Sequence, residues 1–263
     1  MAKSNVTLQH NNDGIGYVSL NDVNARLNLS KGNDKIGNML NISFPIHYTC
    51  DHLAECYLSK ACYGMNGCFC FTNNQIKYSE NLKFFLENDV ETIVNAMKAI
   101  ITANKKESDF FRWFAIGDIC GNKVIDVMNS LAIELPETCF YAYTKKYNLV
   151  NSWIDKNGMF PSNLNVMFSL WTNESGNVTK VNNPYGLTET VFIPYGKEEM
   201  LGDINEVFVC PCSSPNWTGK CTDCSGCPYN THKTIAFLEH STARTKERDK
   251  AIKAGRIEAK KRK

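Results

Sequence analysis

Three cysteines separated by two residues each, in the stretch CTDCSGCPYN, form the most distinctive chemical motif of the sequence. They are Cys221, Cys224 and Cys227, and a proline follows the last of them. Thiolates are soft ligands that favour zinc, copper(I) or iron–sulfur clusters. A CxxCxxC run ending in proline is typical of segments that hold three corners of a [4Fe–4S] cluster. Cys210 or Cys212 would supply the fourth ligand, and we place Cys210 in the predicted set; zinc is the alternative metal.

A second group of cysteines lies nearer the start of the chain, at Cys50, Cys56, Cys62, Cys68 and Cys70. Five residues separate each of the first three from the next, and this spacing matches no common metal template, so a packed turn is one interpretation. Three thiolates in one loop would also suit a cluster with one iron left open. We expect Cys50, Cys56 and Cys62 to be metal ligands. The roles of Cys68 and Cys70 stay open.

The segments that must position these groups alternate between helix and strand from about residue 80 onward. Asn88, with Glu91 three residues later, predicts a helix start. Apolar residues at three- and four-residue steps predict helices at 90–101 and 124–131, and a third at 145–158. Compact apolar runs predict strands at 110–116, 139–144, 164–171, 189–194 and 206–210. Short joins between these elements indicate parallel pairing through right-handed crossovers.

Polar residues stand where three of the predicted strands end. They are Asp118 after Gly117, Thr144 with Lys145, and Ser169. The carboxyl ends of parallel strands meet at one edge of a sheet and line the ligand crevice there. We therefore expect Asp118, Thr144, Lys145 and Ser169 to be catalytic. Helix capping by Asp118 and simple solvation of Lys145 are the alternatives.

Composition narrows the class of protein. The chain has 263 residues, 43% hydrophobic and 21% charged, enough for one α/β barrel with a full core. No apolar run reaches the roughly 18–20 residues that cross a bilayer, and the N-terminus lacks the apolar core of a secretory signal. We expect a cytoplasmic protein without a membrane partner. In a reducing compartment, clustered cysteines are more often ligands than disulfides.

The C-terminal tail carries a charge of its own. Residues 241–263 hold ten Lys/Arg and three Asp/Glu, whereas the whole chain has a net charge of only +2. We therefore divide the chain into one domain at 1–240, with cysteine groups at 50–70 and 210–227, and a basic tail at 241–263. The tail would contact nucleic acid through its phosphates, or act only as a solubilising extension.

The order of several motifs resembles the bacteriophage gene-product-88 domain family. The matching pieces are TC…CYLSKACYGMNG, FFRWFAIGDI, FYAYTKKYNLVNSWIDKNGMFPSNLNVMFSLW, NNPYGL, CP…CTDCSGCPYN and AFLEH. This resemblance implies a phage or prophage gene, acting in the cytoplasm of the bacterial host, and assigns no settled reaction. Where the family usually has His and Ser, this chain has Phe114 and Ile116, which argues against a catalytic role for these two positions.

More distantly, the layout resembles radical S-adenosylmethionine (SAM) enzymes. The N-terminal cysteines, Gly117-Asp118, Thr144 and Ser169 follow one another in the same order as the motifs of those enzymes. This resemblance implies an α/β fold with a partial (β/α) barrel of radical-SAM-like type and cysteine-rich N- and C-terminal segments. It also implies SAM as a cofactor, held by Gly117 and Asp118. The CxxxCxxC signature of those enzymes is absent.

Two functions of different class follow. In the first, the chain is an iron–sulfur enzyme with a radical-SAM-like barrel that acts on a nucleotide or nucleic acid. In the second, zinc or iron–sulfur is structural and the chain is a non-catalytic module that binds nucleic acid or protein. His52 and His232 lie near the cysteine groups, and for each we expect a role other than ligation. The substrate, the number of metal sites and the oligomeric state are not indicated by the sequence.

Overall fold

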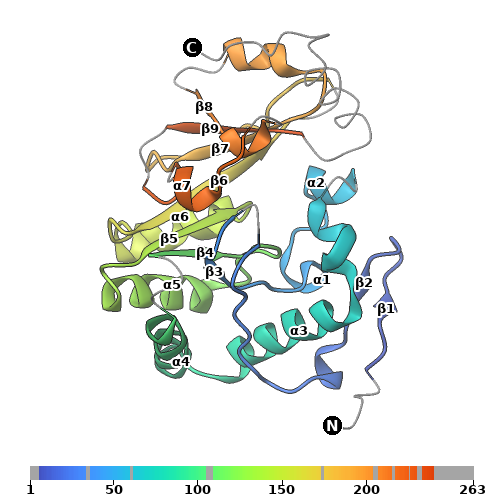
Figure 1. The fold of residues 1–263 in the computed structure, drawn as a ribbon, viewed down its shortest axis with the longest axis vertical. Helices are drawn as coiled ribbons and strands as arrows, with labels where there is room; N and C mark the ends of the chain where they lie inside the picture. The colour runs from blue at the N-terminus through green and yellow to red at the C-terminus, as the bar shows by residue number, and fades with distance from the viewer. Residues whose placement is uncertain are drawn as a thin grey trace.

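The structure is a computed structural model, and a parallel β-sheet is its central element (Figure 1). It describes residues 6–33, 36–59, 62–104, 109–172, 175–203, 207–214, 217–224, 226–229 and 233–239. The sheet is built from β3 (Leu40–Asn41), β4 (Phe110–Trp113), β5 (Cys139–Thr144), β6 (Leu164–Trp171), β7 (Glu189–Ile193), β8 (Val207–Val209) and β9 (Thr234–Leu238). All neighbouring pairs in it are parallel.

The order of the strands confirms an α/β fold, while the partial barrel of radical-SAM-like type is not confirmed. The order is β3-β4-β5-β6-β7-β9-β8, so each strand from β3 to β7 is added beside the previous one, as in a (β/α) barrel. β9 then enters between β7 and β8 and leaves β8 at the edge. No pairing joins β3 to β8 in the described part of the chain, so the sheet is open and no closed barrel forms.

Helices connect and cover the strands. They are α1 (Ile46–Thr49), α2 (Glu55–Leu58), α3 (Thr72–Glu87), α4 (Val90–Ala103), α5 (Asn122–Glu134), α6 (Tyr147–Asn157) and α7 (Cys221–Cys224). Short 3-10 helices lie between them, and β1 (Gln9–His10) pairs with β2 (Gly16–Tyr17) in a small separate hairpin. None of the described helices is both long enough and apolar enough to cross a membrane.

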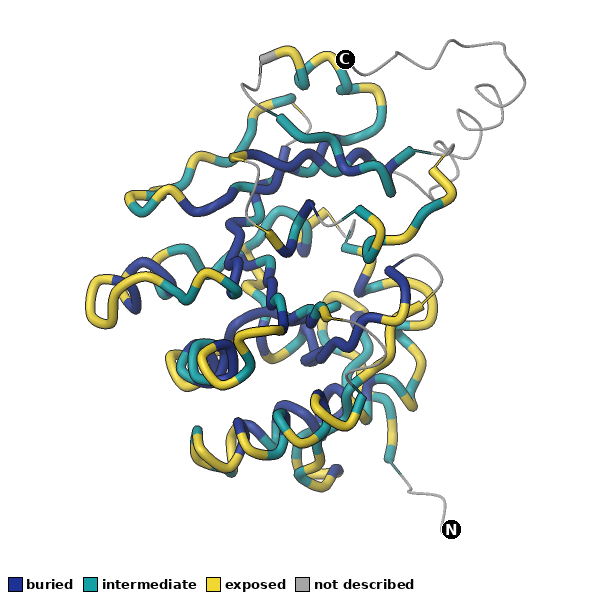
Figure 2. The backbone as a smooth tube through the Cα atoms, turned by 60° about the vertical axis from the view of Figure 1, so that its left-hand side comes forward, coloured by how far each residue is buried: buried dark blue, intermediate teal, exposed yellow. Residues whose placement is uncertain are grey.

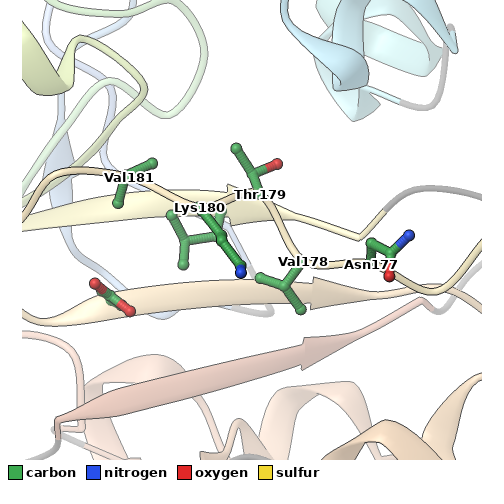
Figure 3. A pocket seen from close by; sticks show the side chains of 7 residues that line it. Asn177, Val178, Thr179, Lys180 and Val181 are labelled. Atoms are coloured by element: carbon green, nitrogen blue, oxygen red, sulfur yellow. The ribbon is translucent and has the colours of Figure 1, made fainter.

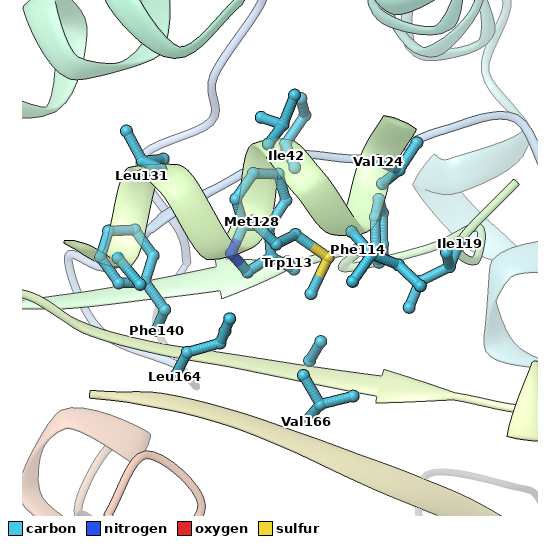
Figure 4. Packing of buried hydrophobic residues seen from close by; sticks show 14 of the residues in the cluster. Ile42, Trp113, Phe114, Ile119, Val124, Met128, Leu131, Phe140, Leu164 and Val166 are labelled. Atoms are coloured by element: carbon cyan, nitrogen blue, oxygen red, sulfur yellow. The ribbon is translucent and has the colours of Figure 1, made fainter. Parts of the chain in front are cut away.

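The main hydrophobic core lies on one face of the sheet. Side chains of α3, α4, α5 and α6 pack there against alternate residues of β4, β5 and β6. Figure 4 shows Met128 and Leu131 of α5 above Trp113, Phe140 and Leu164 of the strands. In Figure 2 the buried stretches lie in the interior of the molecule, while the helices alternate between buried and exposed turns. Because both faces of the sheet are covered, the strands read as nearly unbroken apolar runs.

The opposite face of the sheet carries a different set of side chains. Tyr141, Met167 and Ile235 form a second buried cluster there with Cys210. Half-buried Cys212, Cys221 and Cys227 also pack against it. The C-terminal cysteine segment therefore covers the face that the helices leave open.

Most predicted elements match the structure, and two differ for clear reasons. The predicted strands at 139–144 and 164–171 coincide with β5 and β6. The predicted cap at Asn88 is wrong by one residue: Asp89 caps α4 by accepting a hydrogen bond from the Thr92 N–H at 2.8 Å. The strand predicted at 110–116 ends at Trp113, because the next residue, Phe114, adopts a left-handed backbone with φ of 53°.

The helix α3 was not predicted, because polar side chains occupy much of its buried face. Buried Asn81 donates to the carbonyls of Asn28 and Ser43, both at 3.0 Å, and the Ser79 hydroxyl donates to the Val18 carbonyl at the same distance. These bonds hold the extended N-terminal segment against the helix. Gln75, Ser79 and Asn81 thus share the buried face with Tyr78, Leu82 and Phe85, so that its apolar stripe is short.

Candidate functional site

The first cysteine group lies in the connection that follows β3. Cys50 caps the end of α1, Cys56 lies within α2, and Cys62 precedes a 3-10 helix. The loop folds back on itself, since the Cys62 N–H donates to the Cys56 carbonyl at 3.2 Å. Burial raises the pKa of the Cys50 thiol well above its usual value, and the charges of Asp118, Cys62 and Cys56 raise it further. The three predicted ligands are therefore electrostatic neighbours, beside the Asp118 carboxylate.

Lys145 supplies positive charge to this group. Burial raises the pKa of Cys56 to about 11 and also raises that of Cys62, while the charge of Lys145 opposes both shifts. The Lys145 ammonium donates to the Ser169 carbonyl at 2.7 Å and to the Ser169 hydroxyl at 3.1 Å. Lys145 follows β5 and Ser169 lies near the end of β6. Two predicted catalytic residues thus contact each other directly, and one of them, Lys145, acts on the thiols through its charge.

The carboxylate of Asp118 is occupied by hydrogen bonds from its own chain. Its Oδ1 accepts from the Thr144 hydroxyl at 2.6 Å and from the Ile119 N–H at 2.7 Å, and its Oδ2 accepts from the Lys145 N–H at 3.0 Å. Burial raises the pKa of Asp118, and these hydrogen bonds oppose the rise. The side chain is buried. In this arrangement Asp118 joins the ends of β4 and β5 and fixes Thr144 and Lys145.

Thr144, the third predicted residue at a strand end, is held on both sides. Its hydroxyl donates to Asp118 and accepts from the Lys146 N–H at 3.0 Å, and its side chain is buried. The donor and the acceptor function of this hydroxyl are both used within the protein, which favours a structural role for Thr144. Among the predicted catalytic residues, Lys145 is the one whose positive charge acts on Cys56 and Cys62.

Gly117 makes a close backbone approach that no larger residue would permit. Its φ is +87°, and a Cβ added there would lie 2.5 Å from the carbonyl oxygen of Phe44 and 2.9 Å from its Cβ. Phe44 follows β3 and donates its N–H to the Ile116 carbonyl at 3.1 Å. Gly117 therefore lets the segment after β4 pack against the segment after β3, which leads into the first cysteine group.

Replacing Gly117 with alanine is expected to lower the free energy of unfolding by about 2–4 kcal/mol. A strained backbone and a main-chain clash each cost on the order of 1–3 kcal/mol. Urea denaturation followed by circular dichroism measures the change. Gly202→Ala is the matched control, because no atom lies within 4 Å of the added Cβ there. Equal stability of the two variants would contradict this account of Gly117.

Cys68 and Cys70 lie at the margin of the first group. Cys68 is exposed and Cys70 is half-buried. Burial raises the pKa of Cys70, and the charge of Cys68 adds to the rise. Cys70 in turn raises the pKa of Cys62 slightly. The two residues are neighbours of the Cys50–Cys62 loop, and their roles stay open.

The second cysteine group converges from two segments, 210–212 and 221–227. The sulfur atoms of Cys212 and Cys221 are 3.6 Å apart. Hydrogen bonding with Cys212 lowers the pKa of Cys221 and burial raises the pKa values of Cys224 and Cys227, while the charge of Cys210 acts on all three thiols. All five thiols therefore belong to one neighbourhood, and each cysteine of the chain is free of disulfide bonds.

This neighbourhood is fastened to the sheet. The Asn165 amide of β6 donates to the Cys227 carbonyl at 2.6 Å. Hydrogen bonding from the Tyr143 hydroxyl lowers the pKa of Cys227, although burial dominates and raises it to about 12. The donor set of four or five thiols within one region suits iron–sulfur or zinc in its chemistry. Within the described residues, no three His, Cys, Asp or Glu side chains are close enough together to hold a metal ion as they stand.

The two histidines near the cysteine groups differ in what the structure describes. His52 stacks on Tyr57 with ring centroids 4.6 Å apart, and its Nε2 lies 2.8 Å from the His47 carbonyl. Its ring is thus engaged within its own loop. His232 lies outside the described residues, as does the predicted basic tail at 241–263.

The cysteines differ in the acidity of their thiols, and we expect this difference to appear in the alkylation rates of the metal-free protein. The pKa of Cys221 is lowered, first by hydrogen bonding with Cys212, whereas that of Cys56 is about 11. At pH 8 we expect Cys221 to react with iodoacetamide roughly tenfold faster than Cys56 or more, since only the thiolate reacts. The rate at Cys56 should keep rising to about pH 11. Mass spectrometry of timed samples measures both rates, and equal rates at pH 8 would contradict the prediction.

A separate pocket of about 810 Å³ lies beside the first group (Figure 3). Its wall is the segment 177–181, which runs over β6 and β7. Thr179 of that wall donates to the Glu55 carboxylate at 3.0 Å, and Glu55 precedes Cys56 in α2. No cysteine lines the pocket. It therefore adjoins the cysteine loop without containing it.

Sequence reasoning missed Tyr63 and Arg112, which contact each other across the site. The Arg112 guanidinium donates to the Tyr63 hydroxyl at 2.8 Å. The alternation of residues along β4 could have indicated the position of Arg112. Phe111 and Trp113 pack in the main core, and Arg112 lies between them in the strand. A charged residue at that position belongs to the other face of the strand.

Comparison with known proteins gives one match. The sequence profile of the family described as gene product 88 matches residues 18–260. No curated protein and no solved structure matches the chain significantly. The relation to radical SAM enzymes that the motif order implied gains no support from these comparisons.

Proposed function

The chain belongs to the gene product 88 family, and from that premise we propose that it is an iron–sulfur enzyme of the bacterial host cytoplasm. One observation carries this proposal. Cys50, Cys56 and Cys62 are electrostatic neighbours of each other, and they adjoin Asp118 and Lys145 after the ends of β4 and β5. In parallel sheets, this edge is where ligands and reactive groups gather.

The first group would hold a [4Fe–4S] cluster through three thiolates, leaving one iron open to SAM. When bound, such a cluster supplies one electron for radical chemistry on SAM. The chain's own contribution is electrostatic and positional. Lys145 places a positive charge beside Cys56 and Cys62, which favours their thiolate form. Ser169 fixes the position of Lys145 through two hydrogen bonds, and the three thiols are half-buried.

Asp118 acts in this proposal as a positioning residue. Its carboxylate holds the Thr144 hydroxyl and the Lys145 backbone N–H, so that the Lys145 side chain leaves β5 in one direction. Gly117 admits the close packing on Phe44 that brings the cysteine loop to the same edge. Direct contact of Gly117 or Asp118 with SAM remains part of the proposal. A nucleotide or nucleic acid is the proposed substrate.

The second group would bind a second cluster, or zinc, through Cys210, Cys221, Cys224 and Cys227. Its bond to Asn165 and its packing on Tyr141 and Met167 favour a structural task, namely fastening the C-terminal segment to the sheet. Metal binding there would add to folding free energy. This supports the second candidate function: a metal-stabilised binding module without catalysis, whose basic tail contacts nucleic acid.

Metal analysis of anaerobically purified protein tests the proposal. We expect iron and sulfide in equal amounts and broad absorbance near roughly 400 nm, as thiolate-bound clusters show. Addition of SAM should change the electron paramagnetic resonance spectrum of the reduced cluster, because SAM would bind the open iron. A colourless protein with one zinc would overturn the enzyme and favour the binding module. Iron without any response to SAM would remove SAM from the proposal.

A further inference from the structure

Arg112 is a cation on the face of β4 that points away from the main core. Its guanidinium lies over the ring of Tyr143, 5.3 Å from the centroid, and donates through Nη2 to the Tyr63 hydroxyl. The Tyr63 hydroxyl in turn donates to the Ala115 carbonyl. The Nε of Arg112 is buried and has no hydrogen-bond partner among the described residues. One donor of the guanidinium is thus left unused in a place that water does not reach.

No carboxylate of the described chain compensates this charge. The ion pairs found within the described residues join Lys83 to Glu87 and Lys98 to Glu134, and Arg112 takes part in neither. Burying an unpaired charge and an unsatisfied donor is costly, and proteins retain such groups where a ligand completes them. The partner of Arg112 is therefore expected to be an anion that comes from outside these residues.

The position of Arg112 connects it to both cysteine groups. Tyr63 follows Cys62 directly, and the charges of Cys62 and Cys50 act on the Tyr63 hydroxyl. On the other side, the charge of Arg112 acts on the thiols of Cys221 and Cys227, where it opposes the rise in pKa that burial causes. Tyr63 is 52% exposed and Arg112 is half-buried, so this pair lies near the surface although the Nε of Arg112 is itself buried. Arg112 thus stands between the proposed reactive site and the C-terminal cysteines.

We propose that Arg112 binds an oxyanion of the substrate, a carboxylate or a phosphate, on this face of the sheet. The inference rests on the proposed function, since it names what the substrate carries. A guanidinium offers adjacent N–H donors in the fork geometry that fits both kinds of oxyanion. Tyr63 and Tyr143 fix its plane, one through a hydrogen bond and the other through its ring face. The aromatic rings beside the cation also suit a planar substrate.

Calorimetric titration of the full-length, iron-loaded protein with inorganic phosphate and, separately, with acetate tests the proposal. The wild type is expected to bind at least one of them, and the tighter of the two identifies the chemistry. Arg112→Gln should weaken that binding roughly tenfold or more, as expected when a charged hydrogen-bond donor is lost, and Arg112→Lys should weaken it less. Lys98→Gln is the control, because Lys98 is exposed on α4 and pairs with Glu134. Absence of binding to the wild type, or equal binding by Arg112→Gln, would overturn the proposal.

A second variant keeps the test independent of folding. Tyr63→Phe removes the hydroxyl that orients Arg112 at a half-exposed position, so it should fold and yet bind the anion more weakly; unchanged affinity would overturn the proposal. Iron is measured in every sample. Loss of iron from Arg112→Gln with unchanged anion binding would make Arg112 a counter-charge of the thiolates instead. If the protein contains no iron and still binds phosphate through Arg112, the proposed iron–sulfur function is refuted and the proposed anion site is retained.

Discussion

The Cys56→Ala protein is expected to retain about half of the iron of the wild type after anaerobic purification. Cys56 is one of three neighbouring thiols in the loop after β3, and a cluster held by three protein ligands loses its stability when one is removed. The second cysteine group contacts the other face of the sheet through Asn165 and Tyr141. It should keep its own metal, because none of its thiols comes from the first loop.

The reciprocal variant, Cys224→Ala, is expected to lose the other half. Iron and sulfide analysis per chain, with the visible spectrum, measures both. Cys120→Ser is the control, because Cys120 is exposed and lies in neither group. Complete loss of iron in both variants would indicate a single shared site. Full retention in Cys56→Ala would exclude the first group as ligands, and with it the proposed enzyme.

The second large effect is expected on the free energy of unfolding when Asp118 is replaced. Asp118→Ala would leave three donors without their acceptor: the Thr144 hydroxyl and the backbone N–H groups of Ile119 and Lys145. Each buried donor without a partner costs about 1–3 kcal/mol, so the free energy of unfolding should fall by roughly 4–6 kcal/mol. Chemical denaturation monitored by tryptophan fluorescence measures it, since Trp113 is fully buried beside this strand end.

Asp118→Asn separates the positioning role from catalysis. The asparagine oxygen still accepts from Thr144 and Ile119, while its NH₂ group opposes the Lys145 N–H. We expect a loss of stability smaller than that of Asp118→Ala. If Asp118→Ala instead unfolds like the wild type and only loses SAM binding, Asp118 contacts SAM directly and the positioning account is wrong.

Local patterns in the sequence determined much of the fold. The bounds of β5 and β6 follow from compact apolar runs, since strands covered on both faces need apolar residues at every position. The helix stop at Gly158, with φ of 84°, follows from the preference of glycine for left-handed backbone. The family was likewise readable from the order of short motifs, and the profile match over residues 18–260 confirms it. These features depend on residues close together in the chain.

The tertiary structure decided what depends on distant parts of the chain. The insertion of β9 between β7 and β8 depends on hydrogen bonds between segments far apart in sequence. Their position at the ends of predicted strands identified Asp118 and Lys145 as site residues, but only the structure shows that one fixes the backbone of the other. The pairing of Arg112 with Tyr63 joins residues 49 positions apart. Local sequence sets backbone preference and burial pattern, whereas contacts between side chains are set by packing of the whole chain, and the site is made of such contacts.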